Sequence, residues 1–430
     1  MTRRERIVEL DKRHVWHPYT PMQVYVNETN PLVLERASGS RLFDVDGRSY
    51  IDANASWWTA TLGHDHPRLL AAVSAQLACM PHVPLAGITH EPAAELAHAL
   101  AARAPGLSRI FYSDDGSTSV EVALKLSLQY WQQNGRPRRN RFLALDGAFH
   151  GETLGATALG GVEVFRRPFA SVVLDCLHVA PEPSGYDAAF ERLSHIVERE
   201  HDSLAAIVLE PVVQGAAGMR LYDPALLRAA REITHKHDIF LILDEVFTGF
   251  GRTGPFWAAQ HADVHADLVC TAKGLSGGLI PFAATLTSER IFEGFLGAPE
   301  RAFYYGHTFC GNPLGARIAL EVLRVFDDES VLERARDKAQ QIQRAFQRFA
   351  ELPGVLRTRA LGMIGALDLT GGEGYLQRRG QRVYLEALRR GAYLRPIGNT
   401  VYITPPLNIP DADLGELLDI VEQSVKAAHT

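Results

Sequence analysis

Short apolar runs alternate with longer segments of helical periodicity through the middle of the chain. The runs with strand character are Ile110–Tyr112, Arg141–Leu145, Leu204–Glu210, Ile239–Asp244 and Asp267–Thr271. Segments long enough for helices separate most of them, and strands joined by helical crossovers build parallel sheets. The pattern therefore predicts an α/β chain with a mostly parallel, doubly wound sheet. In such sheets ligands bind at the carboxyl ends of the strands, so the residues that end these runs are the first candidates for function.

Hydrophobic patterning differs at the two ends of the chain. Residues 1–60 contain short alternating strands, and Asp46-Gly47 is a strong signal for a hairpin turn. Residues 326–430 contain a long charged helix, then short strands and a final amphipathic helix. We expect the N-terminal strands to pack with this C-terminal part. The prediction is a large domain over 61–325 and a smaller α+β domain built from both ends of the chain.

Composition and charge argue against several classes of protein. The 430 residues carry 50 acidic and 44 basic side chains, a net charge of −6, so we expect no nucleic-acid partner. The four cysteines form no CxxC pair, which indicates a reduced protein without structural disulfides or a metal site. The N-terminus has no apolar signal region, and no segment approaches the roughly 18 apolar residues of a membrane span. We therefore expect a cytoplasmic protein that does not bind membranes.

Candidate chemistry lies at two of the strand ends. Lys273 stands just after the apolar run that ends at Thr271 and before a glycine-rich turn, and Asp244 ends the run that begins at Ile239. An amine and a carboxylate on neighbouring strand ends are the groups that pyridoxal phosphate requires. The lysine forms a Schiff base with the cofactor aldehyde, and the aspartate keeps the pyridine nitrogen protonated so that the ring withdraws electrons.

A phosphate site is predicted where a helix follows the strand near residue 110. Thr118 and Glu121 have capping-box spacing, which predicts a helix start just after Gly116-Ser117. Free backbone N–H groups and the positive end of the helix dipole would then face an anion. An ordinary helix cap without a ligand explains the same residues equally well.

Two glycine-rich turns admit more than one interpretation. Gly249–Gly254 matches the dinucleotide-binding pattern GxGxxG, but it does not follow its strand directly. We interpret it as a tight loop that supports Asp244, with Arg252 as an ion-pair partner of that carboxylate. The turn Gly306–Pro313 precedes a helix and could offer the Thr308 hydroxyl to a phosphate, although a plain turn and helix start is favoured.

Several aromatic and polar residues have both a structural and a functional interpretation. Phe149 follows a strand, where it would stack on a flat cofactor or serve as a core residue. His150 beside it is interpreted as a histidine that hydrogen-bonds locally. Tyr19 and Trp57 lie in aromatic segments that line a pocket or pack in a core. The Arg395 guanidinium suits a substrate carboxylate, but a surface ion pair is the more common role.

The longest motif, Leu243–Gly254 continued to Lys273, resembles the signature of the class III pyridoxal-phosphate aminotransferases, and the resemblance covers essentially the whole chain. Shorter segments resemble those members of the class that convert 8-amino-7-oxononanoate to 7,8-diaminononanoate in biotin biosynthesis. These segments are His14–Met22, Ala55–Trp58, Pro81–Val83 with Gly87–His90, and Arg395-Pro396 with Tyr402. The resemblance implies pyridoxal 5′-phosphate as cofactor and the fold of the type I pyridoxal-phosphate transferases.

The resemblance also implies roles for individual residues. Lys273 would carry the cofactor and move a proton, and Asp244 would pair with the pyridine nitrogen. The phosphate would be bound by Gly116 and Ser117 together with His307 and Thr308 of the partner subunit, so a homodimer with shared active sites is expected. Substrate contacts are expected from Tyr19, Trp57, Gly306, Arg395 and Tyr402, and Phe149 is expected to contact both cofactor and substrate.

Three residues depart from the pattern of the family. Phe149 stands where many members that use S-adenosylmethionine have tyrosine, His307 replaces a proline, and Phe247 occupies a position that is often glutamine. The loss of the tyrosine hydroxyl leaves S-adenosylmethionine and lysine both open as amino donors. The alternatives are another class III aminotransferase that acts on ω-amino acids, and a non-catalytic binding protein with the same fold.

Overall fold

The computed structural model describes residues 1–181, 185–372 and 374–429. Its centre is a seven-stranded sheet in the order β4-β12-β11-β10-β7-β5-β6. The strands are β4 (Leu107–Ser113), β5 (Arg141–Leu145), β6 (Cys176–Val179), β7 (Leu204–Leu209), β10 (Phe240–Asp244), β11 (Leu268–Thr271) and β12 (Ala283–Ser288). Only β12 runs antiparallel to its neighbours in this sheet. The predicted doubly wound, mostly parallel sheet is confirmed.

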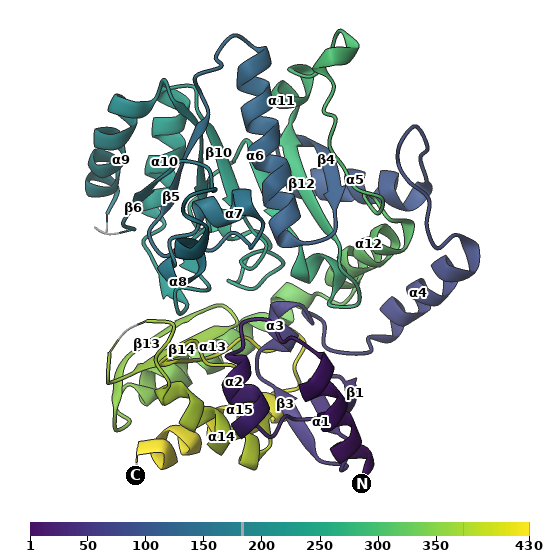
Figure 1. The fold of residues 1–430 in the computed structure, drawn as a ribbon, viewed down its shortest axis with the longest axis vertical. Helices are drawn as coiled ribbons and strands as arrows, with labels where there is room; N and C mark the ends of the chain where they lie inside the picture. The colour runs from purple at the N-terminus through teal and green to yellow at the C-terminus, as the bar shows by residue number, and fades with distance from the viewer. Residues whose placement is uncertain (182–184, 373, 430) are drawn as a thin grey trace.

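Helices cover both faces of this sheet, as Figure 1 shows. Alternate residues of each strand point to opposite faces. Phe240 and Ile242 pack in one core with the helix α6 (Gly116–Gln133), whereas Leu241 and Leu243 belong to the other core, with the helix α10 (Ala225–Lys236). Burial on both sides explains why the strands appear in the sequence as continuous apolar runs.

The remaining elements of the central part of the chain connect these strands and carry the loops around their ends. They are α4 (Pro67–Cys79), α5 (Glu91–Arg103), α7 (Leu154–Leu159), α8 (Glu163–Arg166), α9 (Tyr186–Glu200), β8 (Val213–Gln214), β9 (Arg220–Leu221), α11 (Glu289–Glu293), α12 (Pro313–Asp328) and the 3-10 helices η1 (Arg167–Phe169), η2 (Ala258–His261), η3 (Lys273–Ser276) and η4 (Pro299–Arg301). Among the described residues, no helix is long and apolar enough to cross a membrane.

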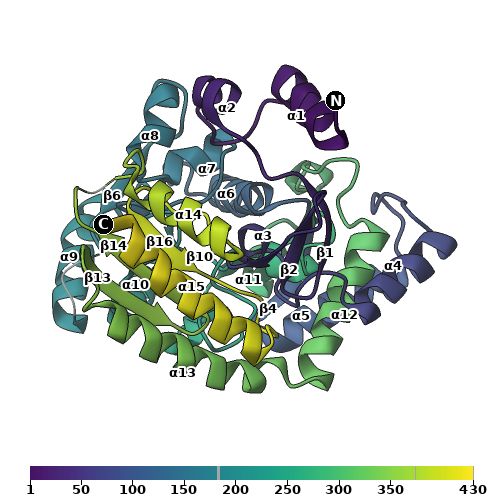
Figure 2. The ribbon, with the colours of Figure 1, turned by 90° about the horizontal axis from the view of Figure 1, so that it is seen from below.

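Both ends of the chain meet in one four-stranded sheet, because β15 (Ala392–Tyr393) pairs in parallel with β3 (Ser49–Asp52). β1 (Leu34–Ser38) and β2 (Arg41–Asp44) complete that sheet, and β2 and β3 form the hairpin predicted at Asp46-Gly47. A second sheet contains β13 (Val355–Leu361), β14 (Ile364–Leu369) and β16 (Thr400–Ile403). The helices α13 (Val331–Phe349), α14 (Arg379–Arg390) and α15 (Asp411–His429) lie beside it in Figure 2. The division into domains at residues 60 and 325 stays a prediction.

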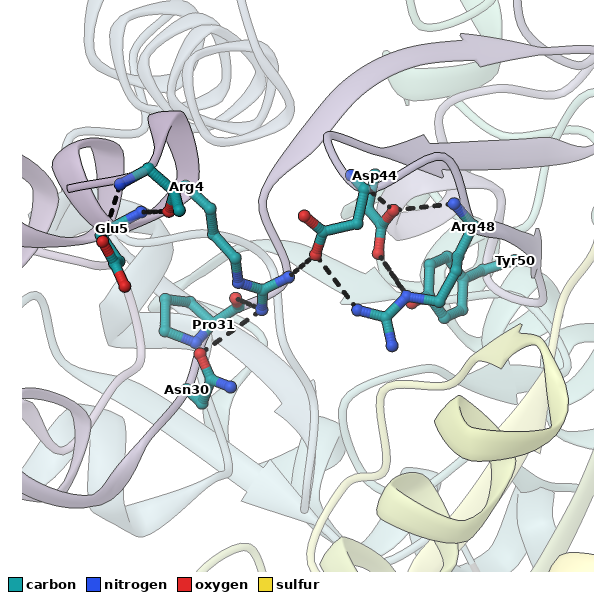
Figure 3. A network of polar contacts seen from close by, with 9 residues as sticks. Arg4, Glu5, Asn30, Pro31, Asp44, Arg48 and Tyr50 are labelled. Atoms are coloured by element: carbon teal, nitrogen blue, oxygen red, sulfur yellow. Dashed lines mark hydrogen bonds and ion pairs between the residues drawn. The ribbon is translucent and has the colours of Figure 1, made fainter.

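Polar contacts attach the N-terminal helix α1 (Arg3–His14) to the hairpin, and none of its residues is buried. In Figure 3, Arg4 lies between the chain near Pro31 and the hairpin turn. Its guanidinium donates to Asp46 Oδ2 at 2.6 Å and to the Pro31 carbonyl at 3.1 Å. Asp44 accepts from the backbone N–H of Arg48 at 2.8 Å and from the Tyr50 hydroxyl at 2.9 Å. The segments α2 (Met22–Glu28) and α3 (Ala55–Trp58) follow α1 toward the central sheet.

Candidate active site

A cavity of about 590 Å³ lies at the carboxyl ends of the central strands. Because β4, β5, β7, β10 and β11 run in the same direction, the residues that follow them reach the same edge of the sheet. The cavity is lined from this edge by Gly116, Ser117, Phe149, His150, Glu210, Asp244 and Lys273, and from the ends of the chain by Tyr19, Trp57, Trp58, Tyr375, Arg395 and Tyr402. Most of the residues predicted from the sequence are therefore brought together.

Lys273 begins the 3-10 helix η3 just after β11, with a φ of 41°. A side chain held in the left-handed region costs free energy, and such residues cluster at functional sites. The Lys273 amine lies 4.9 Å from the centre of the Trp58 ring. Burial lowers the pKa of this amine, and the negative charges of Asp244 and Glu210 oppose that effect only in part. A larger fraction of the amine is therefore neutral at a given pH than for an exposed lysine.

Asp244 is paired with His150, and both side chains are buried. His150 Nδ1 and Asp244 Oδ2 are 2.7 Å apart, and Asp244 Oδ1 accepts from the Val246 N–H at 3.0 Å. Burial lowers the pKa of His150, but the hydrogen bond and charge of Asp244 outweigh it, so the pKa is raised overall. His150 is therefore hydrogen-bonded as expected, but its partner is a carboxylate 94 positions away rather than a sequence neighbour.

The prediction that Arg252 pairs with Asp244 is wrong. The Arg252 guanidinium is buried and donates to the carbonyl of Pro405 at 2.7 Å. The carboxylate next to Asp244, Glu245, accepts instead from the backbone of Ala258 and Ala259, at 3.0 and 2.9 Å. The glycine-rich loop thus connects the central sheet to the C-terminal part of the chain, where its arginine satisfies a backbone carbonyl.

Glu210 is a buried carboxylate in this site to which the sequence analysis assigned no role. It follows β7 directly and accepts from the backbone N–H groups of Phe149 at 2.9 Å and Gly215 at 3.1 Å. Burial raises the pKa of Glu210 to about 7, an effect that the nearby His150 opposes. Its position at a strand end, like that of Asp244, was the signal that could have identified it.

The end of the cavity beside α6 offers backbone donors. The helix begins at Gly116 and its cap is Asp115, whose side chain forms a capping box with Thr118. The predicted capping box of Thr118 with Glu121 is wrong, because Glu121 accepts from Gly155 and Ala156 of α7. A Cβ at position 116 would lie 2.7 Å from Val246 Cγ1, so any larger residue there would force Val246 to shift.

Another wall of the cavity is formed by side chains from the two ends of the chain and by Glu152. The Tyr19 hydroxyl donates to Glu152 at 2.8 Å, and the Arg395 guanidinium lies 3.7 Å from the centre of the Trp57 ring. Burial raises the pKa of Glu152, while the Tyr19 hydrogen bond opposes the change. Tyr402 is buried behind Trp58, with ring centres 6.3 Å apart.

An unusual turn presents the tryptophans to the cavity. Ser56, Trp57 and Trp58 all have positive φ values, of 45°, 63° and 75°, so they form a left-handed turn. The buried Asp52 carboxylate stabilises it by accepting from the Ser56 N–H at 2.7 Å and the Ser56 hydroxyl at 2.8 Å. This strained backbone is compensated by buried polar contacts, as is common where side chains must be held for a ligand.

Three predicted residues, Gly306, His307 and Thr308, do not line the cavity of this chain. His307 Nδ1 lies 3.6 Å from Asp114 Oδ2, and the His307 N–H donates to Cys310 Sγ at 3.2 Å. The resemblance assigned His307 and Thr308 to the active site of a second subunit, and that assignment stays a prediction.

The residues of the cavity fit pyridoxal phosphate. The Lys273 amine can bond to its aldehyde carbon, the Asp244 carboxylate can hold a ring N–H, and the first turn of α6 at Gly116 suits its phosphate. The Trp58 and Phe247 rings, with centres 4.4 Å apart, close one side with apolar surface. Within residues 1–181, 185–372 and 374–429, no group of three or more His, Cys, Asp or Glu side chains could hold a metal ion.

Comparison with known proteins agrees with this geometry. Residues 23–425 match the family model of the class III aminotransferases. The chain is 37% identical to adenosylmethionine-8-amino-7-oxononanoate aminotransferase of Geobacter sulfurreducens, over 96% of each chain. It is 38% identical to the enzyme of the same name from Nitratidesulfovibrio vulgaris, over 99% of this chain and 82% of the relative.

Solved structures of related proteins have the same fold. The adenosylmethionine-8-amino-7-oxononanoate aminotransferase of Methanocaldococcus jannaschii superposes with a TM-score of 0.94 at 32% identity, over 99% of this chain and 100% of that one. An amine transaminase from an uncultivated Pseudomonas species, solved with pyridoxal phosphate bound, gives 0.89 at 29% identity over 96% and 99%. The chain belongs to the class III aminotransferases, which have the type I fold and use pyridoxal phosphate.

Proposed function

We propose that this class III aminotransferase transfers an amino group to 8-amino-7-oxononanoate, giving 7,8-diaminononanoate, with S-adenosylmethionine or lysine as the amino donor. The observation that carries the proposal is the pairing of Arg395 with Trp57 in the same cavity that Lys273 and Asp244 line. The names of the relatives at 37% and 38% identity support it.

When bound, pyridoxal phosphate supplies a carbonyl that bonds to amines and a ring that accepts electrons from the carbon beside the nitrogen. Lys273 is the residue that moves the proton. Its lowered pKa keeps part of the amine neutral, so Nζ could take up a proton at the substrate carbon and move it within the site. Trp58, 4.9 Å from this amine, limits the directions in which it can move.

Asp244 and His150 act as a unit on the ring nitrogen. His150 holds one carboxylate oxygen at 2.7 Å and the Val246 N–H holds the other at 3.0 Å, so the side chain keeps a single orientation. In this orientation the Asp244 carboxylate would face the ring N–H of the cofactor and hold that N–H in place. This arrangement maintains electron withdrawal without a movement of the protein.

The substrate end suits a molecule with a carboxylate at one end and an amine at the other. Arg395 offers a planar set of donors to a carboxylate, and its stacking on Trp57 fixes the orientation of that set. Glu152, held by Tyr19, offers a negative charge to an ammonium group. Phe149 and Phe165, with ring centres 5.8 Å apart, supply apolar surface for the carbon chain between the two ends.

We further propose that the active enzyme is a homodimer in which His307 and Thr308 of the partner subunit complete the phosphate site. Tyr304 and Phe309, which flank these positions, expose 80% and 51% of their surface in the single chain, which supports a covering partner.

Half-reactions test the proposed substrates. The enzyme with bound cofactor is mixed separately with S-adenosylmethionine, lysine and a simple ω-amino acid, and the absorbance of the bound cofactor is followed. We expect one of the first two to convert the cofactor to its amino form, and 8-amino-7-oxononanoate to reverse the change with formation of 7,8-diaminononanoate, detected by mass spectrometry. Conversion by the ω-amino acid alone, with no reversal by 8-amino-7-oxononanoate, would overturn the proposal in favour of an ω-amino acid aminotransferase.

A further inference from the structure

A second cavity, of about 390 Å³, lies between the helices α14 and α15 in the C-terminal part of the chain. These helices pack against each other, and Figures 1 and 2 show them side by side near the C-terminus. Apolar side chains of β14 and the two helices line one part of the cavity: Leu369, Val383, Val425 and Ala428. Basic side chains line the rest: Arg378, Arg379, Arg382 and His429. None of these residues lines the cavity of the candidate active site.

The basic residues of this cavity differ from other arginines of α14 in their contacts. Farther along the helix, Arg389 pairs with Glu386 at 2.5 Å and Arg390 donates to Gln423 at 2.9 Å. Among the described residues, Arg378 and Arg382 have no acidic partner within ion-pair distance, and no carboxylate lines the cavity. Arg378 is the N-cap residue of α14, and Arg382 follows four residues later within the helix.

Arg379 is the fixed member of the set. Its side chain donates to Thr370 Oγ1 at 3.2 Å, and its backbone N–H donates to Asn399 Oδ1 at 3.0 Å. The Asn399 side chain also donates to the Gly372 carbonyl at 2.9 Å. The wall of the cavity is therefore held in place by contacts that reach from α14 to the residue just before β16 and to the chain after β14.

We propose that this cavity is a binding site for a small anion that carries a phosphate group. Guanidinium groups match the geometry of phosphate oxygens and bind them with charge-assisted hydrogen bonds, and two arginines without an acidic partner leave these donors available. The apolar floor formed by Leu369, Val383 and Val425 favours an organic phosphate, whose carbon part would cover this surface.

The position of the cavity connects it with the substrate end of the active site. Tyr375 lines the active-site cavity, and three residues later Arg378 lines the second cavity. Asn399, which holds Arg379, lies four residues after Arg395. The loop of Tyr375 and Arg378 therefore lines both cavities, and the loop of Arg395 is connected to the second cavity through the contact of Asn399 with Arg379.

Inorganic pyrophosphate is the simplest probe of this site. Calorimetric titration of the enzyme with its bound cofactor should show saturable binding, and the melting temperature should rise with pyrophosphate concentration. The absorbance of the bound cofactor should not change, because the probe binds outside the active site. In the double variant Arg378→Gln/Arg382→Gln, affinity should fall at least about tenfold, since each lost charge-assisted hydrogen bond has a large effect.

The matched control is the double variant Arg389→Gln/Arg390→Gln, which removes the same charge from the same helix outside the cavity. Pyrophosphate affinity in this control should stay within about threefold of wild type. The proposal would be overturned by the absence of saturable binding, by an equal loss of affinity in both double variants, or by release of the cofactor in step with pyrophosphate binding. All four positions are exposed, so both variants should fold.

Discussion

The two ends of the active-site cavity are built in different ways. At the cofactor end, Glu210, Asp244 and Lys273 come from neighbouring strands of one sheet and are held among buried groups. At the substrate end, Tyr19 and Arg395 come from loops near opposite ends of the chain, and their side chains remain partly accessible to solvent. The cofactor end is thus rigid and electrostatically coupled, whereas the substrate end consists of loops.

This difference predicts how each end responds to change. A buried charge depends on its neighbours, because an unpaired charge in a water-poor site costs several kcal/mol. Substitutions at the cofactor end should therefore affect the chemical step. Charges at the substrate end are partly solvated, so their substitution should weaken substrate binding and leave the chemical step largely intact.

The largest effect is expected from Lys273→Ala. The variant loses the only lysine amine that lines the cavity among the described residues, so kcat should fall at least about a thousandfold. The start of α6 is unchanged, so the protein should still bind the cofactor without a covalent bond, as cofactor fluorescence after gel filtration would show. Turnover within tenfold of wild type would contradict the role of Lys273, whereas loss of cofactor binding would contradict the assignment of the phosphate site.

His150→Gln should have a smaller effect that depends on pH. A hydrogen bond to a charged group is worth about 1.5–3 kcal/mol, so kcat should fall roughly tenfold to a hundredfold. The pKa of His150 is raised above 6.5 in the folded protein, so its pairing with Asp244 stabilises the fold below pH 6.5 and this stabilisation is lost as pH rises through the folded-state pKa. The difference in melting temperature between wild type and variant should therefore shrink from pH 6 to pH 9.

His178→Gln provides the control, because its pKa is shifted in the opposite direction. Burial lowers the pKa of His178, so in wild type this residue makes the fold less stable as pH falls below 6.5. The wild type should lose stability relative to this variant in acid, which is the reverse of the trend for His150→Gln. The same trend in both variants would contradict the proposed pairing of a charged His150 with Asp244.

The smallest effects are expected at the substrate end. Arg395→Gln should raise KM for the carboxylate substrate about tenfold with kcat within about threefold of wild type, because it removes a charge-assisted contact made before the chemical step.

Glu152→Gln should raise KM only a few-fold, since its carboxylate is partly exposed and the Gln side chain can still accept from Tyr19. Steady-state kinetics would measure both. If kcat fell by a larger factor than KM rose, the substrate end would also affect the chemical step, which contradicts the proposed difference between the two ends.

The sequence identified the main residues of the cofactor end, but it did not predict which side chains they contact. Lys273 and Asp244 could be identified because each follows an apolar run, and parallel strands bring their carboxyl ends together. The pairing of Asp244 with His150 rather than Arg252 could not be predicted, because 94 positions separate the two residues and the sequence does not specify which loop folds back over the strand end. The start of α6 was misplaced because the run from Asp114 to Ser119 contains several residues able to cap a helix.

The sequence alone determined the α/β architecture, the two strand ends and the resemblance to a family, because apolar periodicity and short motifs are local properties of the chain. The tertiary structure decided which charges share the buried site, which arginines have no acidic partner, and how Tyr19 and Arg395 reach the same cavity from positions more than 370 residues apart. The physical reason is that burial, pairing and pKa depend on the distances between side chains, and those distances arise only when the chain is folded.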